Sequence, residues 1–353
     1  MSDVKKPQNS IPVIDISNPS ELVAQQVLDA ASKHGFLYIK NDGVTIPPQD
    51  IDAMFELSKT FFATPIDQKS AYAIHSPKAG GINRGWVSMQ GESLDPSGQK
   101  QGDPKEAFNI APPNLTLQPL PSPLHESSPL ISRFQKDCHK LCTTVLSLLG
   151  TALQIPDPEY FSTRHDQSRG PSGTIFRMLY YPKTLLSQGD EDGDVSSSEP
   201  STTTSIRAGA HSDYGSITLL FRLPGQPGLE LLTGNGWIPV PVNPDEEYLA
   251  RPPILVNIGD LLCYWTNGML KSTVHRVAFE GGEERYSMAY FCHPLDEARL
   301  DAVPSKVIET FGTKGDAELR SQRKRLGLKE DGGDGVITAK GHLERRLKVT
   351  YGI

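Results

Sequence analysis

The segment from residue 174 to residue 292 constrains the fold most, because short strand-like runs follow one another there at close spacing. The runs contain many apolar and β-branched residues, and Gly, Pro and Asn separate them. This pattern of short, closely spaced strands predicts a β-sandwich, a barrel or a jelly roll. The expected strands are 174–181, 206–209, 215–222, 229–232, 236–242, 254–258, 261–265, 273–279 and 285–292.

Helical patterns flank this segment on both sides. A short strand at 11–16 precedes Asn18-Pro19, which are the expected N-cap and first residue of a helix that Gly35 ends. A buried strand at 36–39 follows. Further helices are expected after Pro47-Pro48, over 129–153, from Pro304 and over 341–351. We therefore expect a mainly β protein with flanking helices.

Three stretches lack any regular pattern. Residues 1–10 resemble a loose tail, and 187–204 are acidic and poor in apolar residues, which predicts a flexible insertion between strands. Residues 76–128 are rich in Pro, Gly and Ser, which predicts a long lid-like loop. The expected organisation is a tail, an N-terminal region, a core helix with a linker, a β domain and C-terminal helices, at 1–10, 11–128, 129–171, 172–297 and 298–353.

Composition limits the cellular setting and the partners. The 353 residues are 37% hydrophobic, which is enough for a large core. The net charge is −7, whereas nucleic-acid-binding proteins usually carry an excess of basic residues. The 4 cysteines form no CxxC pair, and neither a signal peptide nor a membrane-length apolar run is visible. We expect a soluble cytoplasmic protein that needs no nucleic acid, membrane or obligate protein partner.

Two histidines and an aspartate form a candidate metal site. His211 and Asp213 lie two residues apart beside an extended run, so their side chains can share one face of a strand. His275 lies on another alternating run and can supply a third ligand. Two imidazoles and one carboxylate on one face leave three coordination positions open, which suits non-haem Fe(II) with a co-substrate and O2. A structural zinc site would need four ligands instead.

A second set of side chains can bind a carboxylate. Arg285 and Ser287 again share a strand face, and a guanidinium beside a hydroxyl makes a carboxylate clamp. Arg177, Leu179 and Tyr181 share a face of an earlier strand, and Tyr181 could add its phenol to the clamp. A metal site and a carboxylate clamp together are the parts needed to bind iron and a dicarboxylate.

Several segments together resemble the Fe(II)/2-oxoglutarate oxygenase family, in its isopenicillin N synthase-like branch. The resemblance extends over roughly residues 11–350, and the run 208–221 resembles thymine-hydroxylase-like enzymes of fungal type. Its motifs are His211-Ser212-Asp213, Val256-Asn257-Ile258-Gly259-Asp260, Lys271-Ser272-Thr273-Val274-His275-Arg276-Val277, Arg285-Tyr286-Ser287, and the N-terminal segments 11–15, 35–38 and 103–106.

This resemblance implies a double-stranded β-helix, or jelly-roll, fold. It implies that His211, Asp213 and His275 bind iron, that Arg285 and Ser287 hold the distal carboxylate of 2-oxoglutarate, and that Tyr181 assists. Many family members carry Asn at the position of Leu179, so one contact to the keto-acid end is missing here or supplied elsewhere.

The implied reaction uses Fe(II), 2-oxoglutarate and O2 to oxidise a C–H bond of a small molecule, with release of succinate and CO2. The outcome can be hydroxylation, desaturation, ring formation or rearrangement, in specialised metabolism or in nucleobase or amino-acid oxidation. Candidate substrate contacts are the aromatic residues Tyr214 and Phe291 near the metal, Arg177, and Arg84 in the lid-like loop.

Three other functions stay open at this point. A related oxidase would bind its substrate directly to iron and use no 2-oxoglutarate. A non-catalytic sensor would bind metal or ligand without turnover. A zinc hydrolase would need a general base beyond the three ligands, and none is obvious in the sequence.

Overall fold

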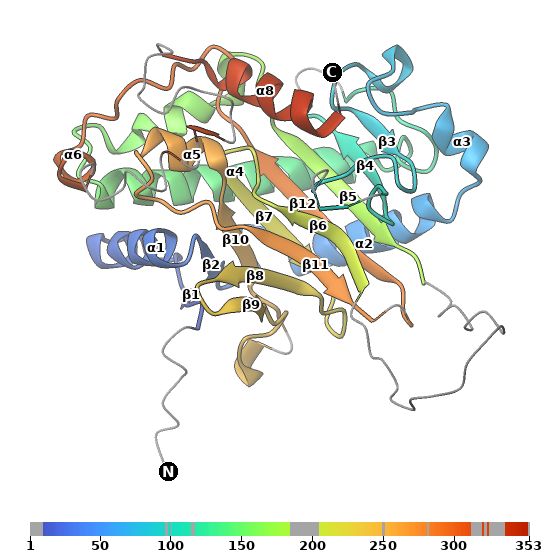
Figure 1. The fold of residues 1–353 in the computed structure, drawn as a ribbon, viewed down its shortest axis with the longest axis horizontal. Helices are drawn as coiled ribbons and strands as arrows, with labels where there is room; N and C mark the ends of the chain where they lie inside the picture. The colour runs from blue at the N-terminus through green and yellow to red at the C-terminus, as the bar shows by residue number, and fades with distance from the viewer. Residues whose placement is uncertain are drawn as a thin grey trace.

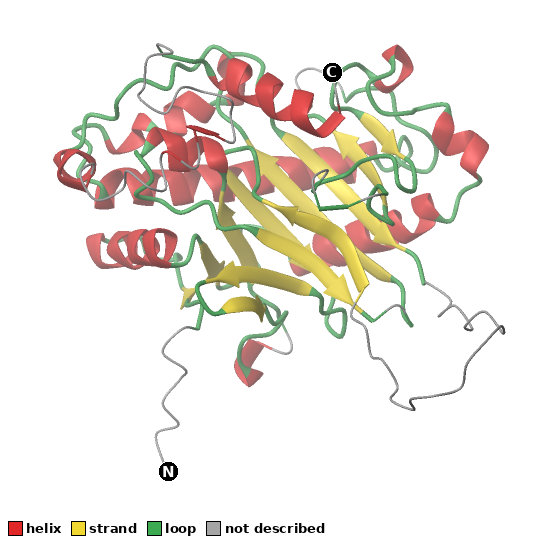
Figure 2. Ribbon diagram, viewed as in Figure 1, coloured by secondary structure: helices red, strands yellow, loops and turns green. Residues whose placement is uncertain are grey.

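The computed structural model describes residues 10–95, 98–99, 101–113, 117–183, 205–248, 251–280, 282–311, 320, 323–324 and 336–351. The expected insertion at 187–204 and nearly all of the expected tail lie outside these residues. Strands form two sheets that face each other, and helices cover the outer side of the larger sheet (Figures 1 and 2). This arrangement confirms the expected mainly β fold with flanking helices.

The larger sheet has eight strands in the order β1-β2-β10-β7-β12-β5-β4-β3. All neighbouring pairs are antiparallel except β1 and β2. The strands are β1 (Val13–Ile14), β2 (Phe36–Ile39), β3 (Gly85–Val87), β4 (Glu106–Ile110), β5 (Ile175–Tyr181), β7 (Ile217–Arg222), β10 (Ile254–Ile258) and β12 (Arg285–Cys292).

The smaller sheet has four strands in the order β6-β11-β8-β9. They are β6 (Ser205–His211), β8 (Leu229–Thr233), β9 (Gly236–Pro239) and β11 (His275–Phe279). In the pairing of β6 with β11, His211 lies opposite His275. The inner faces of the two sheets enclose the space in which the candidate metal ligands meet.

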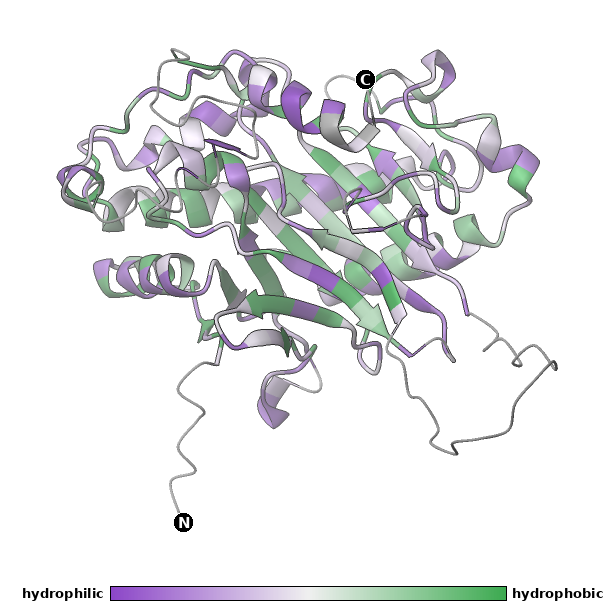
Figure 3. Ribbon diagram, in the orientation of Figure 1, coloured by the Kyte–Doolittle hydropathy of each residue, from purple (hydrophilic) through white to green (hydrophobic). Residues whose placement is uncertain are grey.

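Helices pack on the outer face of the larger sheet. Phe134 of the long helix α4 contacts the rings of Phe176 and Phe221, at centroid distances of 5.4 and 5.1 Å. Figure 3 shows apolar residues concentrated along the sheet strands, whereas α1 alternates between polar and apolar residues. The helices are α1 (Glu21–Lys33), α2 (Pro48–Phe62), α3 (Ile66–Ser70), α4 (Ser128–Ala152), α5 (Asp260–Trp265), α6 (Lys306–Phe311) and α8 (Ala339–Tyr351).

Three expectations about local structure were wrong. The N-cap of α1 is Ser20, whose hydroxyl accepts from the Val23 amide, and not Asn18. Residues 261–265 lie in helix α5 and not in a strand. The expectation failed because a short buried apolar run shows no periodicity that distinguishes a helix from a strand. The expected loop 76–128 contains β3 and β4, which extend the larger sheet beyond β5.

Other expected elements are confirmed with small shifts of their ends. Gly35 follows α1 with φ of 69°, a left-handed conformation that favours glycine at a helix end. The expected strand 236–242 ends earlier, at Pro239. None of the helices in the described part of the chain combines the length and the apolar character that a membrane crossing requires.

Candidate active site

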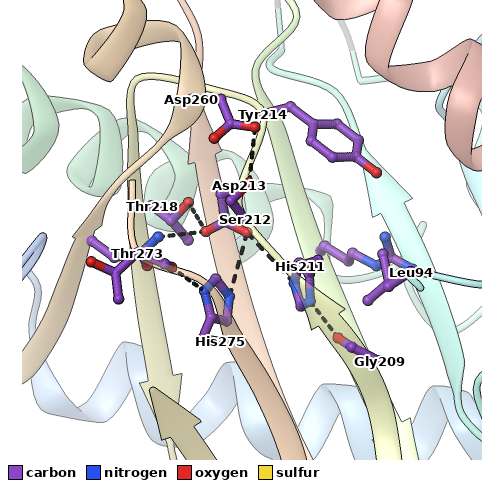
Figure 4. A network of polar contacts seen from close by, with 12 residues as sticks. Leu94, Gly209, His211, Ser212, Asp213, Tyr214, Thr218, Asp260, Thr273 and His275 are labelled. Carbon is purple, nitrogen blue, oxygen red and sulfur yellow. Dashed lines mark hydrogen bonds and ion pairs between the residues drawn. The ribbon is translucent and has the colours of Figure 1, made fainter. Parts of the chain in front are cut away.

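His211, Asp213 and His275 meet at one end of the space between the sheets (Figure 4). Strand pairing brings the two histidines opposite each other, and Asp213 lies two residues beyond the end of β6. The Asp213 Oδ1 atom lies 3.8 Å from His211 Nε2 and 3.7 Å from His275 Nε2. The three donor atoms therefore converge as a metal site requires.

Backbone carbonyls orient both imidazole rings. The His211 Nδ1–H donates to the carbonyl of Gly209 at 2.8 Å, and the His275 Nδ1–H donates to the carbonyl of Thr273 at 3.1 Å. Because a carbonyl only accepts, the proton of each neutral ring lies on Nδ1. The lone pair of each Nε2 consequently points toward Asp213, as it must in order to bind a metal.

Two side chains orient the Asp213 carboxylate. Its Oδ2 atom accepts from the Thr218 hydroxyl and from the Asn257 amide, both at 2.6 Å, so Oδ1 is the oxygen that faces the histidines. Burial alone would raise the pKa of Asp213, but His275, His211 and these two hydrogen bonds outweigh it and lower the pKa. The carboxylate is therefore ionised at neutral pH.

The charge of this donor set fits a divalent metal ion. Burial, and secondarily the neighbouring His275, lowers the pKa of His211 to about 4, so its ring is neutral at pH 7. Two imidazole nitrogens and one carboxylate on a single face match the ligand set of non-haem Fe(II) sites, with the other side open to a cavity. Asn257 and Thr218 were not identified from the sequence, although Asn257 lies in one of the segments that carry the family resemblance.

The expected carboxylate clamp lies further along the same cavity. Arg285 on β12 is directly opposite Tyr181 on β5, and its guanidinium carbon lies 5.1 Å from the centre of the Tyr181 ring. Arg285 donates to the Ser287 hydroxyl at 3.2 Å and to the Pro227 carbonyl at 2.9 Å. Its side chain is almost completely buried, at 2% relative exposure.

Arg285 has no carboxylate partner among the residues that the structure describes. Burial lowers the pKa of its guanidinium, and Tyr181 partly offsets that effect. A buried cation without a counter-ion is costly, and an incoming carboxylate would compensate it through two parallel hydrogen bonds. Leu179, at the position of the family's Asn, lies opposite Ser287 and offers no polar contact.

One cavity connects the candidate metal ligands to the expected clamp and holds about 1040 Å³ free of protein atoms, including its open mouth. Three of the residues expected as substrate contacts line it, namely Arg177, Tyr214 and Phe291. Arg84 does not line the cavity, because its guanidinium turns to the Gly80 carbonyl at 3.0 Å. Its neighbour Asn83 lines the cavity instead.

A buried ion-pair cluster, which was not recognised from the sequence, borders the substrate end of the cavity. Glu92 forms ion pairs with Arg177 and with Lys105, the latter at 2.9 Å, and Lys105 also pairs with Asp103 at 2.6 Å. The sequence singles out Arg177 as a candidate substrate contact, and Asp103 and Lys105 lie in the segment 103–106 quoted for the family resemblance, but the pairing of Arg177 and Lys105 with Glu92 was not expected. The two cations and two anions balance, so this end of the cavity carries no net charge.

The C-terminal helix α8 covers the cavity. Leu343, Leu347 and Thr350 line it. The Tyr214 phenol is hydrogen-bonded to the Thr350 hydroxyl, and Arg346 lies 4.5 Å above the Tyr214 ring. Figure 1 shows α8 crossing the ends of the large-sheet strands. The sequence indicates an amphipathic helix over 341–351 but does not show which of its residues face the cavity.

Arg346 also anchors α8 through Asp260, the first residue of α5. Its Nη2 atom lies 3.3 Å from Asp260 Oδ2, which accepts in addition from the Ser212 hydroxyl at 2.9 Å. Ser212 lies between two of the candidate metal ligands, His211 and Asp213, so α8 is tied to the same short segment that carries them.

Comparisons with known families agree with this geometry. A model described as the N-terminal region of non-haem dioxygenase in morphine synthesis matches residues 11–129, and a model described as the 2OG-Fe(II) oxygenase superfamily matches residues 173–294. A UPF0676 protein of Schizosaccharomyces pombe is 36% identical over 300 residues, which span 82% of this chain and 84% of the relative. Proline hydroxylase buaE of Petromyces alliaceus is 32% identical over 288 residues, spanning 78% and 82% of the two chains.

Solved structures show the same similarity. Full-length Neurospora crassa thymine-7-hydroxylase in complex with alpha-KG and thymine superposes with a TM-score of 0.70 at 28% identity and covers 96% of both chains. Its complex with alpha-KG and 5-formyluracil has a TM-score of 0.70 at 26% identity, covering 99% of this chain and 100% of the other. The expected fold, reaction class and cofactors are thereby confirmed. The chain belongs to the 2OG-Fe(II) oxygenase superfamily and is a 2-oxoglutarate-dependent dioxygenase that uses Fe(II), 2-oxoglutarate and O2.

Proposed function

We propose that His211, Asp213 and His275 hold the Fe(II) of this dioxygenase. The observation that carries this proposal is the convergence of their three donor atoms. Each side chain is held in this orientation by a hydrogen bond to its other polar atom, which is Nδ1 of each histidine and Oδ2 of Asp213. Bound Fe(II) with 2-oxoglutarate supplies O2 activation, in which one oxygen atom enters succinate and the other oxidises the substrate. The protein's own contribution is to keep the His211 ring neutral, the Asp213 carboxylate ionised and the open metal face directed into the cavity.

We also propose that Arg285, Ser287 and Tyr181 bind the distal carboxylate of 2-oxoglutarate. The desolvated Arg285 side chain lacks a carboxylate partner among the described residues, and Ser287 and Tyr181 lie beside it. A dicarboxylate held there can extend along the cavity toward the metal ligands. Its keto-acid end then reaches the open face of the metal site.

The substrate is, in this proposal, a small uncharged molecule with a planar ring and carbonyl groups. Arg177 can donate to a carbonyl, while Tyr214 and Phe291 offer aromatic surfaces for a ring. A charged substrate would have to separate the buried Arg177–Glu92 pair, which is costly. The related thymine-7-hydroxylase, crystallised with thymine and with 5-formyluracil, provides the first compounds to test.

Stoichiometry tests the reaction, and binding tests the substrate class. The purified enzyme with Fe(II) and 2-oxoglutarate should form one succinate per oxidised substrate, and turnover without succinate would contradict the proposal. In an anaerobic titration, thymine or uracil should perturb the visible spectrum of the Fe(II)–2-oxoglutarate complex, and free proline should not. A response to proline alone would overturn the uncharged-ring class and leave the metal assignment untouched.

A further inference from the structure

Asp103 occupies an unusual place just before β4. Its side chain is fully buried, at 0% exposure, although it is a carboxylate, and it does not line the cavity. Its Oδ2 atom pairs with the Lys105 ammonium at 2.6 Å and accepts from the Leu94 amide at 3.3 Å. Its Oδ1 atom accepts from the backbone N–H of Gly209 at 2.8 Å, across 106 residues of sequence.

Gly209 is also the residue that orients a metal ligand. Its carbonyl accepts the Nδ1–H of His211 at 2.8 Å (Figure 4). Asp103 therefore holds the N–H of the same residue whose carbonyl sets the tautomer and the direction of the His211 ring. The position of Gly209 consequently determines where the Nε2 lone pair of His211 points.

The strand ladder does not fix Gly209 by itself. In the pairing of β6 with β11, His211 is opposite His275 and Ala208 is opposite Val277, so two residues of β6 face the single residue Arg276. This is a β-bulge, and the extra residue of a bulge lacks the regular ladder hydrogen bonds. β6 is also the terminal strand of its sheet. An anchor from outside the sheet is thus needed to hold Gly209 in place.

The segment that carries Asp103 closes directly over Gly209. A Cβ atom at Gly209 would lie 2.4 Å from the side-chain oxygen of Gln99 and 2.9 Å from Asp95 Cβ, so only glycine permits this approach. The Asp103 amide donates in turn to the Glu92 carbonyl at 2.8 Å. The N-terminal region therefore wraps the ligand-bearing strand through a continuous set of hydrogen bonds.

We propose that Asp103 is a positioning residue for the metal site, which acts through Gly209 to orient His211. The proposal rests on the proposed role of His211 as an iron ligand. Lys105 serves Asp103 by compensating its buried charge. Burial alone would lower the pKa of Lys105, but Glu92 and Asp103 outweigh that effect and raise the pKa, so the ammonium stays charged.

Two double variants isolate the hydrogen bond from the charge. Asp103→Asn with Lys105→Met keeps an acceptor for Gly209 and removes both charges, whereas Asp103→Leu with Lys105→Met removes the acceptor as well. Lys69→Met with Glu106→Gln is the matched control, because it removes another buried ion pair, of 2.8 Å, between α3 and the first residue of β4, without any contact to Gly209. Each protein is titrated anaerobically with Co(II), and its apo-form melting temperature is recorded.

The Asn/Met variant and the control should bind Co(II) with nearly wild-type affinity and spectrum. The Leu/Met variant should bind about tenfold more weakly with an altered Co(II) d–d spectrum, as is usual when the support of a metal-ligating histidine is lost. Equal affinities and spectra for the Leu/Met and Asn/Met variants would overturn the proposal. If the Leu/Met variant fails to fold, loss of Co(II) affinity in a folded Asn/Met variant overturns it equally.

The variant His211→Ala distinguishes the positioning role of Asp103 from the proposed role of His211 as an iron ligand. Wild-type Co(II) binding by His211→Ala would refute the ligand assignment itself. Weak binding by His211→Ala together with unchanged binding by the Leu/Met variant would refute only the positioning role of Asp103.

Discussion

Asn257 donates a 2.6 Å hydrogen bond to the Asp213 carboxylate, on the oxygen that faces away from the two histidines, although 44 residues separate them in sequence. The Thr218 hydroxyl donates to the same oxygen at 2.6 Å. These two donors decide which carboxylate oxygen faces the two histidines at the candidate metal site. They also favour the ionised form of Asp213, because both hydrogen bonds strengthen when the carboxylate is charged.

Replacing Asn257 by Leu should weaken metal binding without unfolding the protein. Among the residues that the structure describes, the variant leaves Thr218 as the one donor to Oδ2, and loss of such a partner typically costs about 10- to 100-fold in metal affinity. Anaerobic Co(II) titration measures the effect. Thr218→Val is the matched variant, since it removes the other donor, and unchanged affinity in both single variants and in their double variant would contradict this account.

Arg285→Lys should raise the concentration of 2-oxoglutarate that the enzyme requires. Lysine keeps the charge but loses the planar fork that matches a carboxylate. Hydrogen bonds to charged groups contribute about 1.5–3 kcal/mol, which corresponds to roughly a 10- to 150-fold weaker apparent affinity. Anaerobic titration with 2-oxoglutarate measures it. Arg276→Lys is the control, because Arg276 pairs with Glu230 at 2.7 Å and does not line the cavity. Equal affinities in the two variants would show that the clamp lies elsewhere.

Arg346→Met should loosen α8. The variant leaves the fully buried Asp260 without this ion-pair partner, and removal of one member of a buried pair typically costs about 3–5 kcal/mol. Amide hydrogen exchange over residues 339–351 should accelerate, and substrate affinity should fall because α8 lines the cavity. Arg345→Met changes the exposed neighbouring residue and should alter neither quantity. Unchanged exchange in Arg346→Met would show that α8 is held without this pair.

The apoprotein should lose stability as the pH falls below about 6.5. Burial lowers the pKa of His342 to about 4 and that of His293 to about 3, from an ordinary value of 6.5. Between these values the unfolded chain binds protons that the folded chain excludes. Each histidine therefore lowers the free energy of unfolding by up to about 1.4 kcal/mol per pH unit.

Urea unfolding of the apoprotein at pH 7.5, 6 and 5 measures this slope. His342→Leu should reduce the slope by the contribution of one histidine, because His342 excludes a proton when it is buried. Both of its ring nitrogens are buried without a hydrogen-bond partner among the described residues. Leucine also removes that unsatisfied polar group, so the variant should be at least as stable as the wild type at pH 7.5. An identical slope in the two proteins would contradict the effect of His342.

Local patterns were sufficient to predict the parts of the site that depend on strand geometry. His211 with Asp213, and Arg285 with Ser287, share a face because residues two apart on an extended strand point the same way. The same rule placed Tyr181 and Arg177 on one strand, and both line the cavity. It failed at 261–265, where a short buried apolar run forms the helix α5.

The sequence alone determined the family, the reaction class and the residue types of the candidate metal site, because these depend on short motifs and on alternation along single strands. Only the tertiary structure decided which distant groups support that site. The hydrogen bonds from Asn257 to Asp213, from Gly209 to Asp103 and between Tyr214 and Thr350 cross 44, 106 and 136 residues. No local period encodes such contacts, since they form only when separate strands, loops and the C-terminal helix pack against one another.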